Sequence, residues 1–149
     1  MMGSLLLGGS SLLAAAAIAA GPTAQEPEAC KLVDLASAQT VLGSDAVSHG
    51  APGAAGSCQY RSADAKLILV VQILPVVLYD ASPITPREPV EIGDRGRYGV
   101  GTSGTANVQF AKGKYSVTLR VTPMSGPPAT ELVEPMLEIA RLAAERMGN

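Results

Sequence analysis

The spacing of apolar residues along the chain changes from helical to strand-like and then returns to helical. Near the start, four apolar residues recur at helical intervals, namely Leu35, Ala38, Val41 and Leu42. Asp34 precedes them, and its carboxylate can accept hydrogen bonds from the free N–H groups of a first turn. Gly43 follows them and suits the left-handed conformation that often ends a helix. The pattern predicts a short amphipathic helix over residues 35–42.

Strand-like patterns occupy the middle of the chain. Residues 57–62 have the pattern of one strand, and residues 66–74 have that of a longer one in which nearly every position is apolar. Such continuous hydrophobicity predicts a central strand covered on both faces. Pro75 removes a ladder donor, after which residues 76–79 could continue along a sheet edge.

Two further segments, 105–112 and 115–122, predict a hairpin around Gly113. In the second segment Val117, Leu119 and Val121 alternate with Ser116, Thr118, Arg120 and Thr122. This alternation predicts one buried face and one solvated face.

A second helical pattern ends the chain. Its apolar stripe consists of Leu132, Met136, Ile139, Ala143 and Met147. Thr130 can cap this helix, and Pro135 should kink it or mark its true beginning. With consecutive, hairpin-linked strands between two helical segments, the sequence predicts an α+β fold. We expect an antiparallel sheet of about five strands, with a short N-terminal helix and a longer C-terminal helix packed on one face.

The segments between these elements are rich in glycine and proline. Residues 48–56 and 80–89 are predicted to be loops. Residues 99–104 match the G-x-G-x-x-G pattern of dinucleotide sites, in which the glycines precede a helix. Here a strand-like segment follows, and no acidic residue lies between Asp94 and Glu131 to bind a ribose. We therefore interpret residues 99–104 as a glycine-rich hairpin turn, and no cofactor is predicted.

The first 20 residues contain no ionised side chain and are rich in Leu, Ala, Gly and Ser. This composition predicts a signal peptide over residues 1–24, a short leader over 25–29 and a single domain over 30–149. No Lys or Arg precedes the apolar stretch, and an uncleaved membrane anchor is the alternative. Glu28 is unsuited to a lipid-attachment motif ending at Cys30. After cleavage no membrane span is expected.

The chain has two cysteines, Cys30 and Cys58. In an exported protein a lone pair usually forms a disulfide, which here would stabilise the fold by about 3.5 kcal/mol. Two free thiols or a bond to another chain are the alternatives. A secreted or periplasmic location follows from the signal peptide and this pair.

Charge and aromatic content narrow the class of partner. The formal net charge is −2, and the chain has four Tyr, one Phe and no Trp. Binding of nucleic acid is not expected, because it requires clustered positive charge or stacking aromatic rings. His49 is the only histidine and has no second imidazole or nearby carboxylate to complete a metal site. No serine lies in a nucleophile elbow, so no catalytic residue is predicted.

One charged cluster is a candidate for binding. Residues 91–98 read Glu-Ile-Gly-Asp-Arg-Gly-Arg-Tyr. A solvated loop with exposed ion pairs is the simpler interpretation of this cluster. If the protein binds an anionic ligand or an acidic partner, the candidate residues are Arg95, Arg97, Asp94 and Tyr98.

Several short motifs occur along the chain, namely Cys30, Leu32-Val33, Asp34, Leu42-Gly43, Cys58-Gln59-Tyr60 and Gly93-Asp94 with Tyr98. Together they resemble small exported bacterial families of unknown function, many of them lipoproteins, whose fold is similar to the PsbP-like group. The resemblance spans nearly all of the chain after residue 29. It implies a Cys30–Cys58 bond and an antiparallel sheet backed by helices, but no catalytic residues. The chain departs from the family by lacking a lipid-attachment motif and by carrying Arg95 and Arg97.

The sequence thus favours an exported, non-enzymatic binding or accessory module that contacts an envelope protein or a small ligand. A hydrolase with dispersed catalytic residues is the alternative. A deep polar pocket containing His49, Glu91 or Asp94 would favour the enzyme, and a broad exposed apolar patch would favour a partner.

Overall fold

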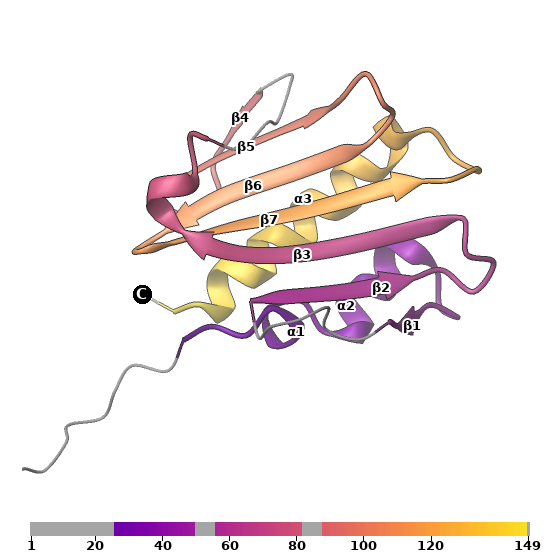
Figure 1. Cartoon of the computed structure of the whole chain (residues 1–149), viewed down its shortest axis with the longest axis horizontal. Helices are drawn as coiled ribbons and strands as arrows, with labels where there is room; N and C mark the ends of the chain where they lie inside the picture. The colour runs from indigo at the N-terminus through magenta and orange to yellow at the C-terminus, as the bar shows by residue number, and fades with distance from the viewer. Residues whose placement is uncertain (1–25, 50–55, 82–87, 149) are drawn as a thin grey trace, which may run out of the picture.

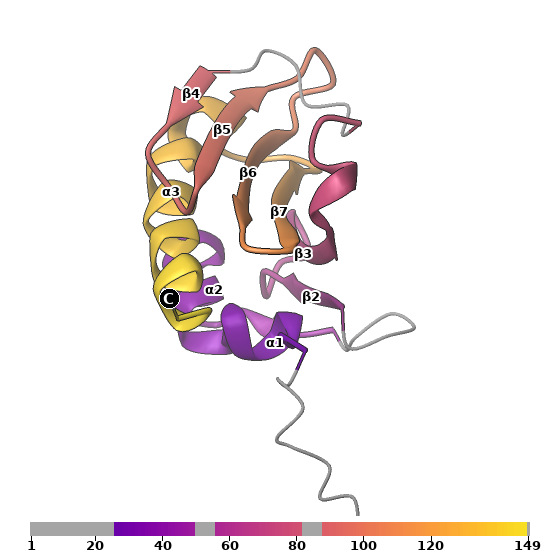
Figure 2. The same ribbon diagram turned by 90° about the vertical axis from the view of Figure 1, so that its left-hand side faces the viewer.

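A seven-stranded antiparallel sheet forms one layer of the molecule, and helices form the other (Figures 1 and 2). The structure is a computed structural model that describes residues 26–49, 56–81 and 88–148. The predicted signal peptide and most of the two loops at 48–56 and 80–89 lie outside the described residues. The α+β class and the antiparallel sheet are confirmed.

The strand order is β1-β2-β3-β7-β6-β5-β4. The strands are β1 Val47–Ser48, β2 Ser57–Arg61, β3 Leu67–Pro75, β4 Glu88–Val90, β5 Arg95–Val100, β6 Ala106–Lys112 and β7 Tyr115–Pro123. The prediction of about five strands was too low. The edge strands β1 and β4 have two and three residues, which is too short for an alternating pattern to be recognised.

Strand β5 lies where the sequence suggested a solvated loop. Gly96 is required there because a Cβ at this position would lie 2.9 Å from the carbonyl oxygen of Val90 on β4. Gly96 therefore permits close pairing of β5 with β4, and the turn is formed by the later glycines Gly101 and Gly104. Gly104, with φ +77°, closes the β5–β6 turn. The predicted hairpin turn over residues 99–104 is therefore confirmed from Gly101 onward, whereas Gly99 and Val100 still belong to β5.

Two helices before the sheet and one after it build the second layer. They are α1 Ala29–Leu32, α2 Leu35–Leu42 and α3 Ala129–Arg146. Helix α2 has the predicted bounds and the predicted cap, since Asp34 Oδ1 accepts a hydrogen bond from the Ser37 N–H at 2.8 Å. The single turn α1 was not predicted. Figure 2 shows all three helices on the same side of the sheet.

The start of α3 differs from the prediction. Pro128 occupies the N-cap position, so Thr130 lies inside the first turn and does not cap the helix. Pro135 lies inside the helix without ending it. Helix packing outweighs the local signals here, because the predicted stripe is buried from Leu132 to Ala143 and holds the helix on the sheet. Met147, the last residue of the predicted stripe, is only partly buried and follows the helix.

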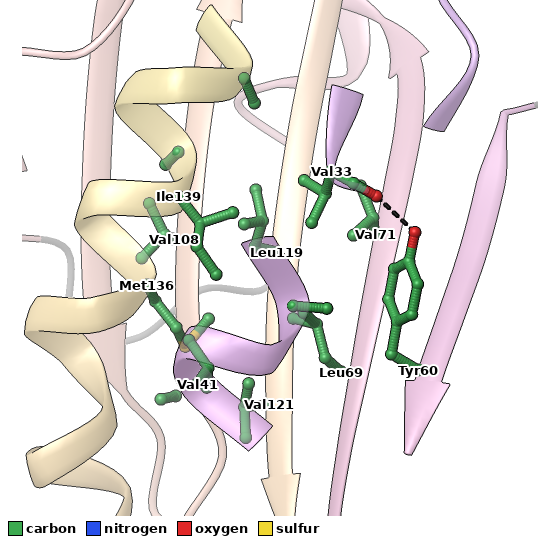
Figure 3. Close-up of a cluster of buried hydrophobic side chains, with 14 of the residues drawn as sticks. Val33, Val41, Tyr60, Leu69, Val71, Val108, Leu119, Val121, Met136 and Ile139 are labelled. Carbon is green, nitrogen blue, oxygen red and sulfur yellow. Dashed lines mark hydrogen bonds between the residues drawn. The ribbon is translucent and has the colours of Figure 1, made fainter. Parts of the chain in front are cut away.

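The hydrophobic core lies between the two layers (Figure 3). The sheet contributes alternate residues of its central strands, all fully buried: Leu69, Val71, Val108, Phe110, Val117, Leu119 and Val121. Registered pairs such as Val71 with Leu119 on β3 and β7 share this face. Figure 3 shows Met136 and Ile139 of α3 and Val41 of α2 directed toward these side chains.

The long strand β3 is central but is not covered equally on its two faces. Its residues alternate between buried and half-buried up to Val71, and Gln72 is exposed. Residues after Pro75 do not continue as an edge strand, because Val76–Leu78 form the 3-10 helix η1. No described helix is both long enough and apolar enough to cross a bilayer.

Candidate binding surface

The N-terminal segment is fixed to the fold by a disulfide. Cys30 on α1 and Cys58 on β2 are bonded, with their Cα atoms 5.2 Å apart. The predicted pairing is therefore confirmed. The Tyr60 hydroxyl, two residues further along β2, donates a hydrogen bond to the Val33 carbonyl (Figure 3).

Arg146 at the end of α3 holds the same segment from the other side. Its guanidinium donates to the Leu32 carbonyl at 2.8 Å and to the Asp34 carboxylate at 3.0 Å. Hydrogen bonds from Ser37 are the main cause that lowers the pKa of Asp34, and the charge of Arg146 lowers it further. Burial raises the pKa of the Tyr60 phenol, and the charge of Asp34 adds to this effect.

The opposite side of the sheet, here called the outer face, carries no described α-helix. One end of it is crossed by a strap, defined as residues 76–81, that follows β3. Figure 2 shows η1 and the turn after it on the side of the sheet away from α3. Tyr79 of the strap is only 4% exposed.

Two of the predicted residues, Arg95 and Arg97, hold this strap. Each guanidinium carbon lies 4.3 Å from the centroid of the Tyr79 ring. Arg97 also donates a hydrogen bond to the Tyr79 carbonyl, and Arg95 pairs with Asp80 at 3.5 Å. The two arginines thus act first as a clamp for a segment of their own chain.

Beneath the strap a row of polar side chains crosses three strands. Arg97 Nε donates to Gln109 Oε1 at 2.8 Å, and Gln109 Nε2 donates to Ser116 Oγ at 3.1 Å. Gln109 and Ser116 are each 1% exposed. The prediction of a solvated face on β7 therefore fails at Ser116 and Thr118, because the strap covers this end of the sheet. Sequence reasoning missed Gln109, whose only signal was its polar position in an alternating strand.

The other two candidates lie elsewhere. Tyr98 points to the helical side, where it packs against the core. The Asp94 carboxylate accepts a hydrogen bond from the Gly113 N–H at 2.8 Å, which fixes the β6–β7 turn. Gly93, with φ +62°, is needed beside it because a Cβ there would lie 2.4 Å from the Ala111 carbonyl oxygen. The structure therefore brings Arg95 and Arg97 together and separates them from Tyr98.

Away from the strap the outer face is accessible. Arg61 on β2 is opposite Ile68 on β3, and Arg120 on β7 is opposite Val70 on β3. Gln72, the next outward residue of β3, is exposed. Two guanidinium groups thus lie on either side of a half-buried apolar ridge formed by Ile68 and Val70.

A groove of about 760 Å³ lies at the end of the molecule where the described chain begins and ends. It lies between the N-terminal segment, the β6–β7 turn and the end of α3, and its lining includes Lys31, Asp94, Lys114 and Arg146. No histidine, serine or cysteine of the described chain lines it. His49 lies instead beside Arg61, with 3.4 Å between Nε2 and the guanidinium, and Glu91 is not part of the groove.

The described residues include no cluster of three or more His, Cys, Asp or Glu side chains that could hold a metal ion. Comparison with protein-family models, with curated proteins and with solved structures finds no match to this chain. The fold is a disulfide-bonded, two-layer α+β arrangement with one face of its sheet open for contact.

Proposed function

We propose that this protein is an exported, non-enzymatic binding or accessory module, and that the outer face of its sheet is the contact surface. One observation carries the proposal. Three helices cover one face of the sheet, whereas the other carries accessible arginine, glutamine and aliphatic side chains on its central strands (Figure 2). A surface of this composition suits contact with a partner, because arginine is enriched at interfaces.

Export is supported by two independent features. The Cys30–Cys58 bond is of the kind that persists in oxidising compartments. The first 20 residues are rich in Leu and Ala, as in the apolar stretch of a signal peptide. A secreted or periplasmic location accommodates both.

The hydrolase alternative has less support. His49 lies exposed beside Arg61 at the β1 edge. Asp94 does line the groove, but its carboxylate is engaged with the Gly113 N–H. With no histidine, serine or cysteine among the described lining residues, the groove lacks a nucleophile and base pair of the usual kind.

Site-specific photocrosslinking in the producing cells tests the proposal. A photoreactive residue replaces Gln72, which is exposed on the outer face, and in a matched control it replaces Glu138, which is exposed on α3. We expect a discrete crosslinked species in the envelope or secreted fraction with the Gln72 variant only. Crosslinking only from Glu138, or from neither position, would contradict the choice of the outer face.

A further inference from the structure

We propose that the outer face binds an acidic polypeptide segment, with Arg61 and Arg120 as the residues that recognise its carboxylates. This inference rests on the proposed function, because it assigns a chemical class to the partner of the same surface. The two arginines come from β2 and β7 and lie on either side of the β3 ridge. Neither was among the residues selected from the sequence.

Charge is distributed unequally between the two layers. The strand registers place Arg61, Arg95, Arg97 and Arg120 on the outer face, and no strand position on that face carries a carboxylate. Helix α3 instead exposes glutamates: Glu131, Glu134, Glu138 and Glu145. Arg97 is only 7% exposed and Arg95 pairs with Asp80 of the strap. The positive charge at the accessible part of this face therefore comes from Arg61 and Arg120, although the chain has a formal net charge of −2. Such a surface attracts and orients an acidic partner.

Arg61 and Arg120 have charge to offer a ligand. Among the described residues, no ion pair joins either guanidinium to a carboxylate. Arg120 Nε donates only to the neutral Asn107 amide at 2.9 Å. Arg61 Nε is buried and has no hydrogen-bond partner in the described chain. A guanidinium presents a fork of donors that matches a carboxylate in two-point geometry.

The neighbouring side chains favour a polypeptide over other anionic polymers. No strand position on the outer face is aromatic, because Tyr60, Tyr98 and Phe110 face the core and Tyr115 lies on the same side of β7 as Val117. The ring of Tyr79 in the strap is only 4% exposed. The surface therefore lacks the rings on which sugars or nucleic-acid bases stack. Gln59 and Gln72 instead offer amides that pair with a peptide backbone, and Ile68 and Val70 offer apolar contact between the two arginines.

The test uses the full chain after export and a labelled oligoglutamate peptide, with binding followed by fluorescence anisotropy at low and at physiological salt. We expect Arg61→Gln with Arg120→Gln to weaken binding about tenfold. The control pair Arg141→Gln with Lys31→Gln removes the same charge from exposed positions on helices α3 and α1, and it should change affinity less than about twofold. Binding should weaken as salt is raised.

A second variant distinguishes a loss of binding from a loss of folding. Gln72→Glu places a carboxylate on the exposed outer face without removing a described hydrogen bond, and we expect it to weaken oligoglutamate binding as well. Equal losses in the outer-face and control pairs would overturn the proposal, since bulk charge would explain them.

Two further outcomes would also overturn the inference. One is stronger binding of polygalacturonate than of oligoglutamate, which would indicate an anionic glycan. The other is self-association abolished by the arginine pair, which would make the acidic α3 of a second copy the occupant. If Gln72 crosslinks to a partner while oligoglutamate fails to bind, only the acidic partner is refuted. If Gln72 gives no crosslink, the proposed function itself fails.

Discussion

The two faces of one sheet are built from alternate residues of the same strands, yet one face packs against the helices and the other is partly exposed. Val117, Leu119 and Val121 face the helices and are fully buried, whereas Thr118, Arg120 and Thr122 face outward. The helical layer is attached by a disulfide and by a continuous apolar core. The strap on the outer face is attached by hydrogen bonds and by the stacking of Arg95 and Arg97 on Tyr79. Stability therefore depends mainly on one face, which leaves the other available for contact.

The largest expected effect concerns the covalent attachment of the helical layer. Cys30→Ala with Cys58→Ala should lower the free energy of unfolding by about 3.5 kcal/mol, because the unfolded chain regains the entropy of an open loop. Denaturant unfolding measures the change, and reduction of the unaltered protein should reproduce it. An unchanged midpoint would show that the attachment of α1 to β2 does not depend on the bond.

A slightly smaller effect compares the two faces of β7. Leu119→Ala should destabilise the fold by about 3 kcal/mol, since it leaves a cavity between sheet and α3. Thr122→Ala, on the outer face of the same strand, should change stability by less than about 0.5 kcal/mol. Thermal and denaturant unfolding check both variants. Similar losses of stability from the two substitutions would contradict the conclusion that stability depends mainly on the face that packs against the helices.

An intermediate effect on stability concerns the hydrogen-bonded row of Arg97, Gln109 and Ser116 beneath the strap. Gln109→Leu should cost about 2 kcal/mol, because Ser116 and Arg97 each lose a hydrogen bond in a buried place. Gln72→Leu, at an exposed position of the same face, should be close to neutral. Hydrogen exchange of the strap amides should rise only in the Gln109 variant. Unaltered exchange would mean that the strap is held without this row.

The smallest effect is the pH dependence of the stability that Asp34 contributes through its hydrogen bonds with Ser37 and Arg146. Asp34→Ala should cost about 1 kcal/mol at neutral pH, through loss of the cap on α2. The pKa of Asp34 is lowered in the folded state, so its contribution is complete above the ordinary value of 3.8. The contribution disappears as pH falls through the lowered value. The difference between variant and unaltered protein should therefore shrink on acidification, and the exposed Asp45→Ala serves as the control.

Local patterns in the sequence were sufficient for several elements. Helix α2, the β6–β7 hairpin and the apolar stripe of α3 follow from spacing and from turn residues such as Gly113, which lies at φ +58°. The disulfide followed from two cysteines in a chain with an apolar N-terminus. These features are determined within one element or by one covalent pair, so a linear pattern can reveal them.

Long-range contacts decided the rest. Strand β5 and the short edges β1 and β4 exist because neighbouring strands pair with them, although their own patterns are weak. The buried row of Gln109 and Ser116 ends at Arg97, which is held by Tyr79, a residue that the strap brings over the sheet from a distant part of the sequence. Likewise Arg61 and Arg120 lie on one surface only through the register of β2, β3 and β7.

The sequence by itself therefore determined the class of fold, the N-terminal helix, the hairpin and the cysteine pair, because these depend on periodicity and on a count of residues. Only the tertiary structure decided which polar side chains are buried and which are accessible. The alternation of a strand assigns residues to two faces but does not say what will cover each face. That choice is made by segments distant in the chain, here α3 on one side and the strap on the other.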